Sequence, residues 1–201
     1  GRASGNAGNG SEDSDKPQVS AREQLNQLIG LGSVKKEIDK MLRMVEFNQQ
    51  RIAKGLEPQE QSYHSVFLGN PGTGKTTVAR ILARLYKQIG VLSTGQLVEC
   101  DRSGLVAGYV GQTAVKTQKK IEEAMGGVLF IDEAYSLARS ADQGTDFGQE
   151  AIDTILKAME DHRDEFVVIV AGYTKPMENF IHSNPGLQSR FNKFIEFPDY
   201  T

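Results

Sequence analysis

A glycine-rich segment between a predicted strand and a predicted helix constrains the fold of this chain more than any other feature. The segment Gly69–Thr76 reads GNPGTGKT and matches the pattern G-x-x-x-x-G-K-[ST] at every specified position. The apolar residues 65–68 precede it, and apolar positions at helical spacing follow it as far as Gly90. Strand, glycine loop and helix in this order predict a phosphate-binding P-loop. The alternative is a glycine turn that merely connects a strand to a helix.

The residue types in this segment suit a bound polyphosphate. Glycines let the backbone curl so that successive N–H groups point inward, and the helix N-terminus adds unpaired donors. Lys75 can reach the β- and γ-phosphates of ATP, and the Thr76 hydroxyl can coordinate Mg²⁺. The predicted ATP- or ADP-binding residues here are Asn70, Pro71, Gly72, Thr73, Gly74, Lys75, Thr76 and Thr77.

Composition argues against several classes of protein. The 201 residues carry a net charge of −3, so no overall basic field indicates a nucleic-acid partner, although a local basic groove stays possible. The single cysteine, Cys100, cannot form an internal disulfide, which suits the reducing cytoplasm. No apolar run approaches the ~20 residues of a membrane span. The three histidines lack the spacing of zinc ligands.

The order of predicted elements indicates an α/β domain. Residues 1–22 are rich in Gly, Ser, Asn and Asp and are expected to form a disordered tail, while residues 23–201 form the core. A helix is expected from an N-cap at Ser33 to about Gly55, and another after Gly148. Alternation of strands and helices favours a parallel five-stranded sheet in a three-layer P-loop NTPase fold. The strands are expected at 65–68, 96–100, 128–131, 166–171 and 194–197.

A second motif, at residues 128–133, joins a continuous apolar run to two carboxylates. The run Val128–Ile131 is typical of a strand covered on both faces, and Asp132 and Glu133 follow it directly. They should emerge at the carboxyl edge of the sheet, where ligands bind in such folds. Asp132 could then hold Mg²⁺, directly or through water, and Glu133 could polarise a water towards the γ-phosphate. The alternative is an acidic strand-to-helix turn, which the pairing with the P-loop disfavours.

These motifs resemble the AAA+ ATPases, from about Leu28 to Thr201. The similarity is strongest to a branch that contains red-type rubisco activases, stage V sporulation K-type proteins and cytosolic ATPases of type VII secretion. It implies Mg²⁺-dependent ATP hydrolysis by a homo-hexameric ring that acts on a protein client. The stretches that carry it are Gly69–Thr76, Ala124–Tyr135, Phe147–Ile152, Ala171–Tyr173, Asn184–Phe191 and Phe197–Tyr200.

The resemblance also implies roles for residues outside the two motifs. Leu28, Ile29 and Gly30 would contact the adenine ring, and Thr174 would act as a polar sensor of the γ-phosphate. Arg190 would be the arginine finger that enters a neighbouring subunit's site, where a cation stabilises developing phosphate charge. The alternative for Arg190 is a surface ion pair.

The triplet Tyr109-Val110-Gly111 would line the central pore of such a ring and grip a polypeptide. The alternative is that Tyr109 anchors its loop to the core. Members of the family also carry a helical lid after the α/β core, and this chain ends at Thr201, where that lid would begin. We therefore expect the 201 residues alone to be largely monomeric and to hydrolyse ATP feebly.

The favoured function is the ATP-binding and ATP-hydrolysing module of a motor that remodels or threads proteins. Two alternatives stay open: a nucleic-acid-associated motor or loader, and a non-catalytic module that uses ATP only to order an assembly. DNA-stimulated turnover would favour the first alternative. The presence of both Glu133 and Arg190 disfavours the second.

Overall fold

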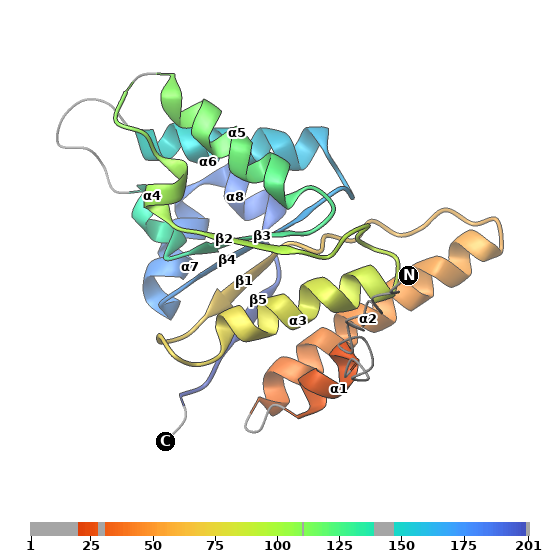
Figure 1. The fold of residues 1–201 in the computed structure, drawn as a ribbon. Helices are drawn as coiled ribbons and strands as arrows, with labels where there is room; N and C mark the ends of the chain where they lie inside the picture. The colour runs from red at the N-terminus through yellow and green to blue at the C-terminus, as the bar shows by residue number, and fades with distance from the viewer. Residues whose placement is uncertain (1–19, 28–30, 110, 139–146, 200–201) are drawn as a thin grey trace, which may run out of the picture.

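The structure is a computed structural model that describes residues 20–27, 31–109, 111–138 and 147–199. Its strands form one parallel sheet in the order β2-β3-β4-β1-β5, with helices on both faces (Figure 1). This confirms the three-layer α/β fold with a five-stranded parallel sheet. The strands are β1 Ser65–Leu68, β2 Leu97–Cys100, β3 Val128–Asp132, β4 Val167–Gly172 and β5 Phe194–Glu196.

Two hydrophobic cores lie on opposite faces of the sheet. One core packs Phe67 and Phe130 against the first group of helices, and the other packs Val66 and Leu129 against the second group. The three central strands are buried on both faces, which explains their continuous apolar sequences. The first group is α1 Ala21–Asn26, α2 Gly32–Ala53 and α3 Lys75–Gln88. The second is α4 Arg102–Leu105, α5 Gln112–Ala124, the 3₁₀ helix η1 Ala134–Ala138, α6 Phe147–Asp161, α7 Thr174–Ser183 and α8 Pro185–Arg190.

Several predicted helix boundaries need correction. Helix α1 begins at Ala21 behind a capping box formed by Ser20 and Glu23, two residues before the expected start of the core at residue 23. Helix α2 begins at Gly32 with no side-chain cap, so the prediction of Ser33 as its N-cap is wrong. Gly148 lies inside the first turn of α6 rather than before it. A Cβ there would lie 2.0 Å from the Leu137 carbonyl oxygen, so close packing explains this glycine.

The end of α2 follows the prediction. Gly55 has a φ of 76°, and its N–H donates to the Ile52 carbonyl while that of Leu56 donates to the Arg51 carbonyl. These two hydrogen bonds form the pattern that ends a helix when a glycine takes the left-handed conformation. No helix among the described residues is long and apolar enough to cross a membrane.

Candidate functional site

The P-loop connects the carboxyl end of β1 to the first turn of α3. Gly72 and Gly74 have φ values of 79° and 94°, and Gly74 occupies the N-cap position of α3. Gly69 packs against the chain that leaves β5, because a Cβ there would lie 2.7 Å from the Phe197 carbonyl oxygen. Two of the loop's glycines therefore provide a left-handed backbone, and the third permits a close approach.

The ammonium group of Lys75 is held inside the curl of the loop. Its Nζ donates to the carbonyl oxygens of Gly69 at 2.5 Å and Asn70 at 2.9 Å. Burial lowers the pKa of Lys75, while Asp132 and Glu133 act in the opposite direction. These two carboxylates therefore help to keep a buried lysine charged at neutral pH.

One pocket of about 380 Å³ brings the two sequence motifs together. The P-loop residues predicted to bind phosphate line the same space as the carboxylates that follow β3, since the carboxyl ends of parallel strands meet at one edge. The pocket is lined by Gly69, Pro71, Gly72, Gly74, Lys75, Thr76, Thr77, Asp132, Glu133, Gly172 and Tyr173.

The turn after β3 holds its second carboxylate in an unusual conformation. Glu133 has a φ of 49°, a left-handed conformation that costs a non-glycine residue roughly 1–3 kcal/mol. The Glu133 N–H donates to Asp132 Oδ1 at 3.0 Å, and the Glu133 carbonyl accepts the Ser136 N–H at 2.9 Å. These two hydrogen bonds, one of them to the following 3₁₀ helix, stabilise the turn at Glu133.

The oxygen atoms at the pocket suit Mg²⁺, which prefers hard oxygen ligands and usually keeps several waters and substrate phosphates. Thr76 contributes a hydroxyl and Asp132 a carboxylate. Within the described ranges, no group of three or more His, Cys, Asp or Glu side chains could hold a metal by itself. The protein oxygens therefore suit a cation whose remaining ligands come from a bound nucleotide and from water.

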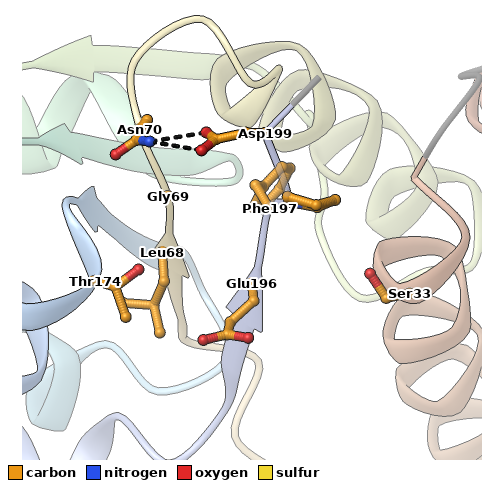
Figure 2. A pocket seen from close by; sticks show the side chains of 9 residues that line it. Ser33, Leu68, Gly69, Asn70, Thr174, Glu196, Phe197 and Asp199 are labelled. Atoms are coloured by element: carbon orange, nitrogen blue, oxygen red, sulfur yellow. Dashed lines mark hydrogen bonds between the residues drawn. The ribbon is translucent and has the colours of Figure 1, made fainter. Parts of the chain in front are cut away.

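A second cavity of about 310 Å³ adjoins the P-loop on the side of β5 (Figure 2). Thr174 lines this cavity and not the P-loop pocket, where Gly172 and Tyr173 take its place. Thr174 therefore lines a different cavity from Lys75, and its role as a sensor stays a prediction. The lining residues are Ser33, Leu68, Gly69, Asn70, Thr174, Glu196, Phe197, Pro198 and Asp199.

The two predicted residues for contacts between subunits lie away from both cavities. Arg190, at the end of α8, pairs with Glu160. The side chain of Tyr109 is 75% exposed, so the alternative that it anchors its loop in the core is wrong. Gly111, with a φ of 80°, caps the N-terminus of α5. The predictions for Leu28, Ile29, Gly30 and Val110 fall outside the described residues.

Sequence reasoning assigned no role to Tyr173 or Asp199, which line the two cavities. Each follows a predicted strand within one or two residues of the carboxyl edge. That position is the signal that could have identified them, because the P-loop lies at the same edge.

Comparison with known proteins places the chain in a family. A model described as the ATPase family associated with various cellular activities (AAA) matches residues 65–199. The chain is 49% identical over 178 residues to stage V sporulation protein K of Bacillus subtilis, covering 89% of this chain and 55% of that protein. It is 49% identical over 175 residues to Protein CbbX of Cereibacter sphaeroides, covering 87% and 56%.

A third relative is the ESX-1 secretion system protein EccA1 of Mycobacterium tuberculosis, 47% identical over 182 residues, which cover 90% of this chain and 32% of that protein. The chain thus spans about half the length of the first two relatives and a third of the last. These similarities confirm the branch expected from the motifs. The chain belongs to the AAA family of ATPases.

Proposed function

We propose that this chain is the Mg²⁺-dependent, ATP-hydrolysing module of a ring-forming motor that remodels or threads a protein client. Membership of an ATPase family supports the general activity. The observation that carries the proposal for this chain is the single pocket shared by Lys75, Thr76, Asp132 and Glu133. Phosphate binding, Mg²⁺ coordination and water activation require these four kinds of group within one site.

Each residue has one task in the proposed reaction. Lys75 and the loop N–H groups bind and orient the β- and γ-phosphates, and Thr76 and Asp132 would hold the metal. When bound, Mg²⁺ supplies positive charge at the phosphate oxygens. Glu133 orients the attacking water towards the γ-phosphate and accepts a proton from that water.

Coupling of hydrolysis to a client requires contacts beyond one subunit. In the proposed homo-hexamer, Arg190 completes the site of a neighbouring subunit and Tyr109 grips the client polypeptide. The exposure of Tyr109 supports this role, since an exposed aromatic side chain offers a broad apolar contact. The net charge of −3 gives no support to a nucleic-acid motor.

Calorimetric titration of the chain with ATP and Mg²⁺ tests the nucleotide site. We expect Lys75→Ala to weaken ATP binding by roughly 100-fold or more, because charge-assisted hydrogen bonds to the phosphates are lost. Lys87→Ala removes an exposed lysine from the same helix and should bind ATP as the wild type does. Equal affinity of the two variants would refute the P-loop assignment.

A further inference from the structure

The P-loop is tied to the chain that leaves β5 by a pair of side-chain hydrogen bonds. Asn70 Nδ2 donates to both carboxylate oxygens of Asp199, at 2.8 and 3.0 Å (Figure 2). The two residues are 129 positions apart in the chain. Their contact depends on the placement of β5 beside β1 at the edge of the sheet.

Asn70 is also the residue on which the phosphate-binding groups of the loop converge. Its carbonyl oxygen accepts the Lys75 ammonium at 2.9 Å and the Thr73 hydroxyl at 2.8 Å. The side chain of Asn70 thus faces Asp199 while its backbone faces the lysine and threonine of the loop. Hydrogen bonds thus connect Asp199 to Asn70 and Asn70 to Lys75.

The segment that carries Asp199 is itself firmly placed. The Phe197 N–H donates to the Leu68 carbonyl at 2.7 Å, which extends the pairing of β1 with β5 by one residue. The Phe197 ring is buried and lies with its centroid 4.9 Å from that of Phe67. The close approach at Gly69 brings the same backbone against the start of the P-loop. Asp199 itself is exposed and lies two residues beyond this packed position.

We propose that Asp199 is a positioning residue for the nucleotide site. Its carboxylate holds the Asn70 side chain, which sets the orientation of the Asn70 carbonyl and hence of Lys75. Nucleotide affinity thereby depends on the position of the chain that follows β5. This inference rests on the proposed nucleotide-binding function.

The sign of the effect separates positioning from simple electrostatics. A carboxylate beside a polyphosphate site repels the ligand, so charge alone predicts tighter nucleotide binding when Asp199 is neutralised. Positioning predicts the opposite, since loss of the carboxylate frees Asn70 and disorders the loop that must meet the phosphates.

The test compares ADP affinity and amide hydrogen exchange in four variants of the full chain. Asp199→Ala should weaken ADP binding by roughly three- to tenfold, the range of a hydrogen bond to a charged group at an exposed site. It should also speed exchange of the amides of residues 70–75 without ADP. Asp199→Asn keeps an oxygen acceptor for Asn70 and should lie close to the wild type. Asn70→Ala combined with Asp199→Ala should lose no more affinity than Asp199→Ala alone.

Glu196→Ala is the matched control, because this carboxylate lines the same cavity and makes no hydrogen bond to the P-loop among the described residues. It should leave P-loop exchange at the wild-type rate. Unchanged exchange in Asp199→Ala, or ADP affinity that is unchanged or higher, would overturn the inference. A wild type that binds no nucleotide would instead refute the proposed function, and the exchange measurement would still decide whether Asp199 positions the loop.

Discussion

Glu160 of α6 forms an ion pair with Arg190 of α8, thirty residues further along the chain. The Arg190 guanidinium also donates through Nη1 to the Gly186 carbonyl oxygen at 3.2 Å. The cation proposed to act in a neighbouring subunit is thus held within its own subunit by one partly exposed carboxylate. Such a pair contributes only ~0–1 kcal/mol, so it can be exchanged for a phosphate at small cost.

In a longer protein that includes the lid and assembles into a ring, we predict that Arg190→Ala lowers ATP turnover by up to roughly 10³-fold and leaves the nucleotide affinity of a single subunit nearly unchanged. Mixed rings provide the measurement, because an Arg190→Ala subunit should impair hydrolysis by its wild-type neighbour. Damage confined to the mutated subunit would contradict action between subunits.

Glu160→Gln separates the finger role from the ion pair. The amide removes the charge that competes for Arg190, so turnover of the ring should be equal to or above that of the wild type. If Glu160→Gln lowers turnover as far as Arg190→Ala does, the pair itself is the functional element and Arg190 is no finger.

Glu133→Gln should separate nucleotide binding from hydrolysis. The amide preserves shape but cannot accept the proton of the attacking water, so turnover should fall by roughly 10²–10⁴-fold while ATP still binds. Phosphate release and ATP titration measure the two effects. Glu122→Gln, at an exposed position on α5, serves as the control. Hydrolysis at the wild-type rate in Glu133→Gln would require another base.

Tyr109→Ala should impair work on a client without affecting the fold. Because the side chain is 75% exposed, its truncation should change the free energy of unfolding by less than about 0.5 kcal/mol in urea titrations. In a longer protein that includes the lid, ATP turnover should persist within a few-fold, while remodelling of the client by the ring should fail. Normal remodelling would show that Tyr109 does not touch the client.

His64 couples the stability of the sheet to pH. Its Nδ1 accepts the Val168 N–H at 2.9 Å, and its ring lies 6.0 Å from that of Phe191. Burial lowers the pKa of His64 to about 4, and the cations of Arg190 and Lys193 act in the same direction. A protonated imidazole would also lose the acceptor that satisfies Val168.

The unfolded chain therefore binds a proton at His64 more readily than the folded chain between pH 6.5 and about 4. The contribution of His64 to the free energy of unfolding is fully present above pH 6.5. It is lost as the pH falls to about 4, by up to ~3 kcal/mol at 1.36 kcal/mol per pKa unit. We predict that His64→Gln, which retains an acceptor, flattens the pH dependence of urea unfolding. His182→Gln, at an exposed position, should leave it unchanged. Equal slopes in all three proteins would contradict the role of His64.

The local features of the site were predictable because each depends on contiguous residues. The segment Gly69–Thr76 encodes its own backbone curl through glycine, and the apolar run before Asp132 encodes a strand buried on both faces. Alternation of such strands with helices leaves parallel pairing as the favoured arrangement. The nucleotide pocket then follows from where the carboxyl ends of parallel strands meet.

Only the tertiary structure decided which distant side chains meet around that pocket. The order of β4, β1 and β5 brings Asp199 to Asn70 and places Thr174 in the second cavity, and packing of α6 against α8 brings Glu160 to Arg190. None of these contacts can be predicted from the separation of the two residues in the sequence. A long intervening segment places little constraint on how far apart its ends lie in the folded protein. Ser33 likewise lies inside α2, which begins at Gly32 with Leu31 at its N-cap position.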